Sequence, residues 1–319
     1  MSAASWSGFG VMGLGMCLPG PALGNRIVAE RCGTSPEWVA ERTGIISRHH
    51  RAAGQGTADL AVSAAEAAIA DAQVRPDMVV LATVTPDRPV PATASAVQDR
   101  LGLHGAPAVD VNAACSGFVY AVTMAWGAMA TGIATTPLVI GADVFTRHVD
   151  PGDRRTAPLF GDGAGAIVLG AVPPGFGILA VELWADGALQ ELAHVPAPEA
   201  GSPSWFHMDG RGVRDVVLDM GPKLLDSVLS AADLPIDQLD RVIVHQANPK
   251  LVQTLAESVR LDDRIVPLFG KRTGNTASAS LPVSLAFAHR ERPLQRGAYV
   301  ALVAVGAGMT AGAMLIRWY

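Results

Sequence analysis

The residue best placed for covalent chemistry is Cys115, in the stretch Asp110-Val-Asn-Ala-Ala-Cys-Ser-Gly. An apolar run at 106–111 predicts a buried strand. Residues 116–131 predict a helix without a charged residue, which is typical of a helix at the centre of a protein. At the start of that helix, free backbone N–H groups and the helix dipole favour the thiolate. An inert buried thiol is the alternative, and the small residues around the sulfur favour the nucleophile.

Two polar residues in the second half also stand at the ends of predicted elements. His245 follows a strand at 241–244 in the motif HQAN, and Asn275 precedes a helix at 280–290 in the motif GNT. Taken alone, such a His is typical of a structural role and such an Asn of a helix N-cap. An internal duplication would bring both to the same place as Cys115. We therefore predict that Cys115, His245 and Asn275 converge on one site.

The elements that must position these residues occur twice in the chain. The segment 77–83 is echoed by 240–245 at an offset of about 163 residues, and the Cys115 stretch then falls on 274–279. Near the ends of the halves, 161–169 matches 308–316 at an offset of 147. The first half should therefore contain an additional loop, which we place at 143–158. We expect two halves, 1–170 with the cysteine and 171–319 with His245 and Asn275.

Short runs of Val, Ile, Leu and Ala alternate with longer helical patterns in both halves. We predict strands at 78–84, 108–111, 138–141, 241–244 and 299–305. We predict helices at 57–72, 92–101, 116–131, 213–232, 249–259 and 280–290. This alternation predicts an α/β fold whose sheets are mostly parallel or mixed. The helices after Cys115 and Asn275 should lie together between two sheets, and the polar stretch 196–212 should run over the site.

Composition restricts the class of protein. Half of the 319 residues are apolar and 17% are charged, and the net charge of −5 argues against a general nucleic-acid binder. Cys17, Cys32 and Cys115 lack metal-ligand spacing, so we expect a reducing compartment, no disulfide and no metal. Glycine and proline interrupt both the N-terminal apolar stretch and the uncharged span 111–142, so neither a signal peptide nor a membrane span is expected. These features predict a cytoplasmic protein.

Four motifs together resemble the thiolase superfamily. They are AACSG at 113–117, GDGAG at 161–165, HQAN at 245–248 and GNT at 274–276. Within that superfamily they are similar to 3-oxoacyl-acyl-carrier-protein synthase III, and SPEWVAERTGI at 35–45 and GAGMTAGAMLIRW at 306–318 extend the match over nearly the whole chain. Elongating ketosynthases have a second His where Asn275 stands, and biosynthetic thiolases need a second Cys after Cys115. The resemblance implies a duplicated thiolase-like α/β fold, with two mostly parallel or mixed sheets around central helices in a layered αβαβα arrangement.

The resemblance also implies a two-step reaction. Cys115 would attack an acyl-CoA thioester and become acylated. A malonyl group on an acyl carrier protein would enter next, and His245 and Asn275 would donate hydrogen bonds to its thioester oxygen while loss of CO2 leaves an enolate. The enolate would then attack the acyl group on Cys115. The backbone N–H groups of Cys115 and Ala307 would form the oxyanion hole.

Further positions follow from the resemblance. The coenzyme A contacts fall on Trp38, Arg42, Arg154, Arg211, Asn248 and Lys250. Trp38 and Arg154 would enclose the adenine ring, and Arg42 would face a phosphate. Arg211 and Lys250 would flank the entrance and meet phosphates of coenzyme A or an acidic carrier protein. The implied partners are acyl-CoA, the carrier protein and a second copy of the chain, without nucleic acid or membrane. No permanently bound cofactor is implied, since coenzyme A is a substrate.

Three departures from the family pattern leave the acyl primer open. Val90 replaces a larger aromatic residue that bounds the acyl pocket from the partner subunit, so the pocket should be deeper than acetyl needs. Pro249 follows HQAN, and Ala311 replaces an aromatic residue. Such changes also suit a relative in specialised metabolism that delivers its acyl group to an alcohol or amine. Asn275 favours condensation, because that transfer needs a base but no enolate. A non-catalytic subunit of the same fold is a third reading, and the intact catalytic set argues against it.

Overall fold

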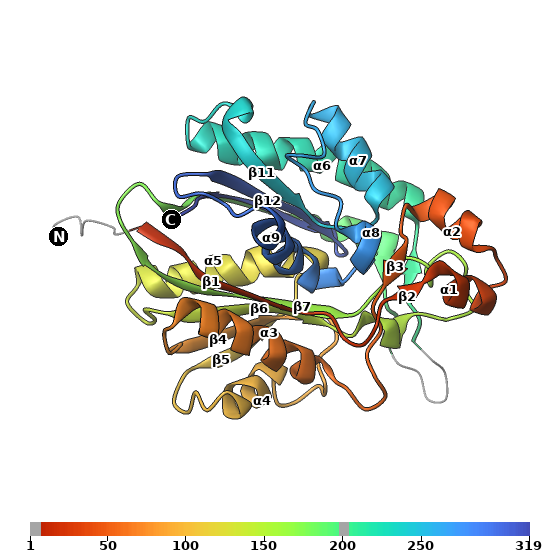
Figure 1. The fold of residues 1–319 in the computed structure, drawn as a ribbon, viewed down its shortest axis with the longest axis horizontal. Coiled ribbons are helices and arrows are strands. Elements are labelled where there is room, and N and C mark those ends of the chain that lie inside the picture. The colour runs from red at the N-terminus through yellow and green to blue at the C-terminus, as the bar shows by residue number, and fades with distance from the viewer. Residues whose placement is uncertain (1–7, 198–203) are drawn as a thin grey trace.

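The computed structural model describes residues 8–197 and 204–319, which form two β-sheets with helices between and outside them (Figure 1). The first sheet has the order β1 (Gly8–Cys17), β7 (Gly163–Val172), β6 (Pro137–Asp143), β4 (Met78–Ala82) and β5 (Ala108–Val111). The second has the order β11 (Leu239–Val244), β12 (Tyr299–Gly306), β13 (Thr310–Arg317) and β8 (Gly177–Ala185). Both sheets are mixed: β4 runs parallel to β5 and β6, β11 runs parallel to β12, and the other neighbouring pairs are antiparallel.

Two helices form the central layer, as predicted. Helix α5 (Gly117–Ala130) contacts β4 and β6 on one side and β12 and β13 on the other. Helix α9 (Ser280–Glu291) contacts β7 and β6 of the first sheet and β11 and β12 of the second. Phe118 and Val122 of α5 and Leu281 of α9 are fully buried in one cluster. A helix enclosed by sheets on both sides has an apolar surface all round, which explains why α5 contains no charged residue.

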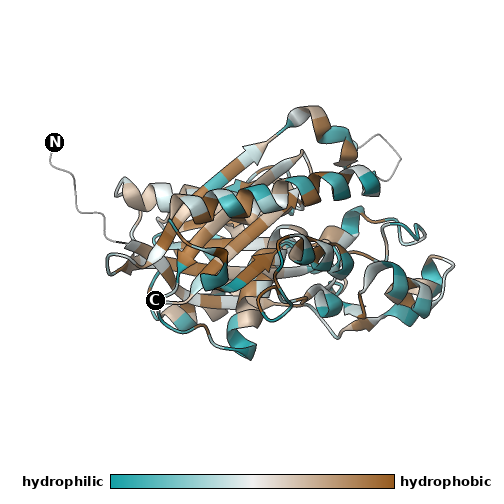
Figure 2. Ribbon diagram, turned by 90° about the horizontal axis from the view of Figure 1, so that it is seen from above, coloured by the Kyte–Doolittle hydropathy of each residue, from teal (hydrophilic) through white to brown (hydrophobic). Residues whose placement is uncertain are grey.

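The outer helices complete the five-layer arrangement. Helices α3 (Thr57–Ala72) and α4 (Thr93–Arg100) cover the first sheet, and α6 (Gly210–Ala231) and α7 (Pro249–Ser258) cover the second. Figure 2 shows mostly hydrophobic strands beneath outer helices of mixed hydropathy. The shorter elements are β2 (Leu23–Gly24), α1 (Asn25–Arg31), α2 (Pro36–Thr43), β3 (Ser47–Arg48), η1 (Ala114–Ser116), η2 (Phe145–His148), η3 (Gly187–Leu192), β9 (Ala193–His194), β10 (His207–Met208), η4 (Ile236–Gln238), α8 (Gly270–Thr273) and η5 (Ala277–Ala279). Among the described residues, none of the helices has the length and hydropathy needed to cross a lipid bilayer.

The two halves repeat one topology. The turn η1 and helix α5 begin 163 residues before η5 and α9. Nineteen residues separate β6 from β7 and three separate β12 from β13, which accounts for the difference of 16 between the two offsets. Among the described residues of the second half no strand is a regular counterpart of β5, although Val242 N donates to Ile265 O at 2.8 Å where Val79 N donates to Pro107 O at 2.8 Å in the first half. The duplication inferred from weak sequence echoes is thus visible in the fold.

Two boundary predictions were wrong around Asp143. The loop predicted at 143–158 begins one residue later, because Asp143 is the last residue of β6 and is fully buried. The strand predicted at 78–84 ends at Ala82, because Thr83 Oγ1 and Val84 N turn out of the sheet to donate to the Asp143 carboxylate. A buried carboxylate recruits local donors and so ends the regular strand. The helix predicted at 57–72 was correct at both ends. The apolar run at 106–111, predicted as a buried strand, forms a strand only at 108–111, and this edge strand is partly exposed, with Val109 42% exposed.

Candidate active site

The structure brings Cys115, His245 and Asn275 to one cavity of about 690 Å³. Cys115 lies in η1 after β5, His245 follows β11, and Asn275 precedes η5, so all three come from the ends of duplicated elements. The remaining wall is largely apolar. Three of its side chains form an aromatic cluster in which Phe145 stacks on Phe160 at 4.4 Å and Phe206 meets both rings edge-on at 5.3 Å. A cavity with an apolar wall and a few convergent polar groups has the character of a substrate site.

The expectation of a ready thiolate at Cys115 was wrong for this structure. Burial raises the pKa of the Cys115 thiol to about 12, and the nearby Asp143 carboxylate raises this pKa further in the same direction. Cys115 sits in the short turn η1, and α5 begins only at Gly117. The loss of solvation outweighs the effect of the helix end. The thiol therefore needs a base or an arriving substrate to lose its proton.

His245 is held in a neutral form beside this thiol. Its backbone N donates to Val303 O at 2.8 Å at the end of β11, and its side chain is 5% exposed. Burial lowers the pKa of His245 to about 4. Nδ1 has no partner among the described residues. A neutral imidazole is both a possible proton acceptor and a hydrogen-bond donor, depending on its tautomer.

Asn275 is fixed through both its backbone and its side chain. Its backbone N donates to Leu159 O at 2.8 Å, and its O accepts from Gly161 N at 3.0 Å. The side-chain Oδ1 accepts from Ala277 N at 2.9 Å. Because Oδ1 is occupied in this way, the two N–H groups of Nδ2 are the side of the amide available to a substrate oxygen.

The Gly306–Ala307–Gly308 turn passes directly against Cys115. A Cβ added to Gly306 would lie 2.7 Å from Cys115 N, so only glycine allows this approach. Thr310 supports the turn, because its Oγ1 lies 3.0 Å from Ala307 O and 2.9 Å from Ala113 O. We did not single out Thr310 from the sequence, although it lies inside the motif GAGMTAG.

The motif HQAN divides into two kinds of residue. His245 and Ala247 line the cavity, whereas Gln246 and Asn248 make structural contacts. Gln246 N donates to Ser280 Oγ at 2.7 Å, and Gln246 Oε1 accepts from Gly270 N at 2.8 Å. Asn248 Oδ1 accepts from Leu251 N at 2.9 Å and so caps α7. Asn248 is thus the N-cap of α7, a structural role that the sequence did not predict for this residue, which was expected to bind coenzyme A.

The residues expected to bind coenzyme A lie outside the cavity lining. Trp38 and Arg42 share helix α2, with the guanidinium 5.9 Å from the ring centroid. Arg154 is exposed in the loop before β7, and Arg211 and Lys250 are exposed in the first turns of α6 and α7. A Cβ built on Gly44, which ends α2, would lie 3.5 Å from Lys250 Cγ, so α2 adjoins the start of α7. None of Arg42, Arg154, Arg211 and Lys250 forms a salt bridge within residues 8–197 and 204–319.

Two further features concern the walls of the cavity. Val90 is 81% exposed and does not line the cavity of its own chain. The stretch predicted to run over the site contributes Pro196, Phe206 and Met208 to the lining, and its residues 198–203 lie outside the described part of the chain. The polar lining residues Gln190, Glu191 and His194 were not predicted, because no motif marks them.

The chain is similar to known proteins over nearly its whole length. Residues 109–187 match the family model of 3-oxoacyl-[acyl-carrier-protein (ACP)] synthase III, and residues 229–318 match its C-terminal model. The beta-ketoacyl-[acyl-carrier-protein] synthase III of Neisseria gonorrhoeae is 40% identical over 97% of this chain and 98% of its own. Synthase III 3 of Streptomyces coelicolor is 41% identical over 96% of both chains. The crystal structure of 3-oxoacyl-(acyl carrier protein) synthase III from Pseudomonas aeruginosa superposes with a TM-score of 0.93 at 38% identity, covering 98% of each chain.

Proposed function

The chain belongs to the 3-oxoacyl-[acyl-carrier-protein] synthase III family, and from this membership we propose how its own residues carry out the family's reaction. The protein is an acyltransferase of the condensing type: the family joins an acyl group from acyl-CoA to a malonyl group on acyl carrier protein. The observation that carries our assignment of roles is the convergence of Cys115, His245 and Asn275 on one cavity beside the Gly306 turn.

In the first step, Cys115 exchanges with the coenzyme A thiol. His245, which is neutral at neutral pH, accepts the thiol proton as the sulfur attacks the thioester carbonyl. The backbone N–H groups of Cys115 and Ala307 stabilise the oxyanion. The carbon–sulfur bond to coenzyme A then breaks, and its thiolate takes the proton back from His245. Cys115 is left as an acyl thioester.

In the second step, a malonyl thioester loses CO2 at the same place. In the tautomer whose proton is on Nε2, His245 donates together with Nδ2–H of Asn275 to its thioester carbonyl oxygen, where negative charge develops as the bond to the carboxylate breaks. The enolate carbon attacks the acyl carbonyl on Cys115, and the carbon–sulfur bond to Cys115 breaks. The product is a 3-oxoacyl carrier protein, and the Cys115 thiolate that leaves takes a proton from solvent to restore the thiol.

The experiment that tests these roles measures the two steps separately. Acylation of Cys115 is followed by intact mass, and CO2 release is followed from malonyl carrier protein. Asn275→Ala should keep acylation near the wild-type rate and lose about 10²-fold of decarboxylation, because one donor to the developing charge is removed. Wild-type protein that becomes acylated but releases no CO2 would overturn the proposal. The acyltransferase to an alcohol or amine is then the alternative, since it needs His245 as base but not Asn275.

Coenzyme A recognition is a further part of the proposal. We assign the adenine ring to Trp38 and Arg154, and phosphates to Arg42, Arg211 and Lys250, because the family resemblance indicates these positions and they carry exposed cations and a half-exposed indole. Trp38→Ala should raise KM for acyl-CoA and leave acyl-pantetheine, which lacks the nucleotide, nearly unchanged. An equal rise for both donors would contradict this role.

We also propose a homodimer in which Val90 bounds the acyl pocket of the partner subunit. Strand β5 forms an edge of the first sheet, and Val109 on it and Met124 on α5 are exposed apolar side chains, which supports an interface there. Val90→Phe should shift the preference of the enzyme toward shorter acyl primers.

The three unpaired cysteines support a reducing, cytoplasmic location. We also propose that the chain divides into two halves, 1–170 and 171–319.

A further inference from the structure

We propose that Asp143 is a positioning residue for Asn275: through Ser278 it holds the start of the second central helix so that the Asn275 amide faces the substrate. This inference rests on the proposed function, in which Asn275 stabilises the enolate. Asp143 is fully buried at the end of β6 and takes no part in the mechanism described above. Its carboxylate nevertheless takes part in six hydrogen bonds.

The two carboxylate oxygens of Asp143 bind two different parts of the chain. Oδ1 accepts from Val84 N at 2.8 Å and from Thr85 N at 3.1 Å, with the hydroxyls of Thr83 and Thr85 both at 3.0 Å. Oδ2 accepts from Ser278 N at 2.8 Å and lies 2.6 Å from Ser278 Oγ. The carboxylate therefore connects the end of the first sheet to η5 of the second half.

The path from Ser278 to the functional amide is short. Ser278 follows Ala277, whose N–H donates to Asn275 Oδ1 and so fixes the direction of the amide. Ala277 has a left-handed backbone with φ of 48°, a conformation that persists in a non-glycine residue only when its neighbours hold it. Asp143 holds the residue immediately after it.

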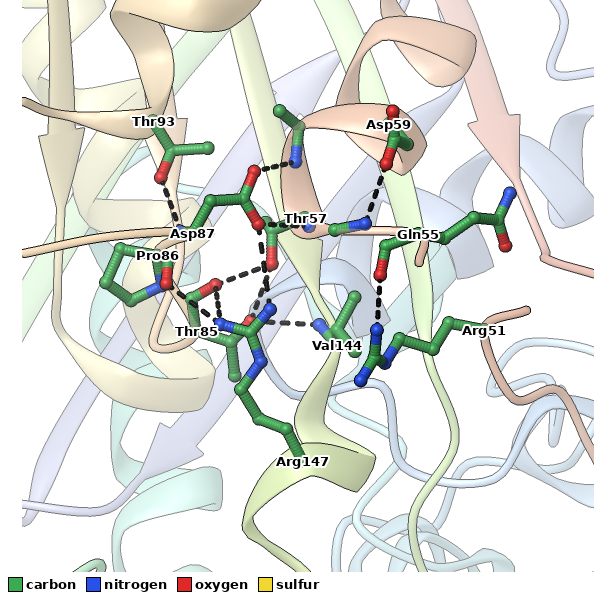
Figure 3. A network of polar contacts seen from close by, with 12 residues as sticks. Arg51, Gln55, Thr57, Asp59, Thr85, Pro86, Asp87, Thr93, Val144 and Arg147 are labelled. Atoms are coloured by element: carbon green, nitrogen blue, oxygen red, sulfur yellow. Dashed lines mark hydrogen bonds and ion pairs between the residues drawn. The ribbon is translucent and has the colours of Figure 1, made fainter. Parts of the chain in front are cut away.

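The side of Asp143 that faces Thr85 is rigid. Figure 3 shows that Thr85 has further partners besides Asp143: Val144 N donates to its Oγ1 at 2.9 Å, Thr57 Oγ1 lies 3.0 Å from the same oxygen, and Arg147 Nη1 donates to Thr85 O at 3.4 Å. Within the described part of the chain, the Ser278 side chain has one other hydrogen bond, from Oγ to Ala82 O at 2.8 Å. A change at Asp143 will therefore displace Ser278 rather than Thr85.

The duplication supports this division of labour. At an offset of 163 residues, Ser278 corresponds to Cys115 and Asp143 corresponds to Gly306. In the second half, the N–H of Ser278, which follows the left-handed Ala277, donates to the Asp143 carboxylate. At the equivalent place beside Cys115 the strand ends in Gly306, which has no side chain to bind the Cys115 N–H and leaves it beside the cavity. The first arrangement fixes a turn, and the second leaves a donor for substrate.

Asp143→Asn is the isosteric test. The remaining oxygen of the amide can serve the rigid Val84 and Thr85 donors, and its NH2 group then faces Ser278 N–H, so donor meets donor. Acylation of Cys115 should stay within about threefold of wild type, whereas CO2 release should fall by about 10-fold or more, without exceeding the loss in Asn275→Ala. In the Asn275→Ala background, Asp143→Asn should cost no more than about threefold further, because its effect passes through Asn275.

The matched control is Asp77→Asn. Asp77 accepts from Thr135 N at 2.7 Å, Thr136 N at 3.0 Å and the Thr135 hydroxyl at 2.6 Å, just before β4 begins and therefore at the opposite end of the same sheet. This variant should lower Tm without changing the ratio of acylation to decarboxylation. Ser278→Ala, which keeps the backbone N–H and removes only the hydroxyl, should show a smaller selective loss of CO2 release and serves if Asp143→Asn fails to fold.

Three results would overturn the inference. They are equal loss of both steps in Asp143→Asn or Ser278→Ala, an undiminished effect of Asp143→Asn in the Asn275→Ala background, and full CO2 release by the folded Asp143→Asn protein. In each case wild type still releases CO2, so only the role of Asp143 fails. Wild type that releases no CO2 would overturn the proposed function, and the role of Asp143 with it.

Discussion

Ala114 and Ala277 stand 163 residues apart and adopt the same left-handed backbone conformation, with φ of 47° and 48°. Ala114 begins η1 and Ala277 begins η5, the short turns that precede the two central helices. The residues that follow them are Cys115 and Ser278, respectively. Left-handed alanine is uncommon, and two copies at equivalent positions indicate that the turn geometry is needed in both halves. In the first half this turn presents Cys115 to the cavity, and in the second half it fixes the amide of Asn275.

This backbone conformation predicts opposite tolerances at Ala277. Ala277→Gly should change the free energy of unfolding by less than about 1 kcal/mol, because glycine adopts a positive φ freely. Ala277→Val should destabilise by about 2 kcal/mol or more, because a β-branched side chain is strained at positive φ and overfills a site that is 1% exposed. Urea unfolding of both variants checks this, and equal destabilisation by Gly and Val would contradict it.

The raised pKa of Cys115 predicts a pH profile for alkylation. The rate with iodoacetamide should increase with pH through the neutral and mildly alkaline range, without a plateau near the ordinary thiol value of 9.0. A plateau at or below the ordinary value would show that burial does not control this thiol.

The depressed pKa of His245 predicts a stability change in acid. Unfolding restores its ordinary value of 6.5, whereas the folded value is about 4, so the unfolded state binds more protons between them. Its stabilising contribution is present above the unfolded pKa and is lost as pH falls through that window, by an amount on the order of 3 kcal/mol. As pH falls from 6.5 to about 4, the unfolding free energy of wild type should decrease relative to that of His245→Gln by an amount on the order of 3 kcal/mol, and parallel curves would refute the depressed pKa of His245.

The hydroxyl of Thr310 should affect acylation of Cys115 but not decarboxylation of the malonyl group. Thr310→Val keeps the shape but removes the hydroxyl that lies between Ala307 O and Ala113 O. The oxyanion donors should lose alignment, so acylation of Cys115 should slow by about 10-fold while CO2 release from malonyl carrier protein changes little. The rate of Cys115 acylation is measured from quenched time courses by intact mass. The matched control is Thr310→Ser, which retains the hydroxyl. Equal slowing in Val and Ser variants would assign the effect to packing.

The sequence was sufficient for the fold and for the three central side chains, for a physical reason. Periodicity and apolar runs determine the strands and helices, and a duplicated topology brings residues at equivalent ends together, as Cys115 and Asn275 show. Asp143 was missed because a charged residue after an apolar run has the pattern of a loop, and only the folded chain supplies the donors that bury it. The turn at Ala277 was missed because alanine carries no signal of a positive φ. Thr310 was missed because its partners, Ala113 and Ala307, are far apart in the sequence.

The central claim is that acyl-Cys115 is condensed with a malonyl carrier protein in this cavity. The most direct measurement is the intact mass of the carrier protein after malonyl carrier protein is mixed with acylated wild-type enzyme, alongside CO2 release. We predict that the malonyl mass is replaced by the mass of the 3-oxoacyl product, that CO2 appears in equal amount, and that Cys115→Ala forms no 3-oxoacyl product. A carrier protein that keeps its malonyl group while Cys115 passes its acyl group to an added alcohol or amine would contradict the claim.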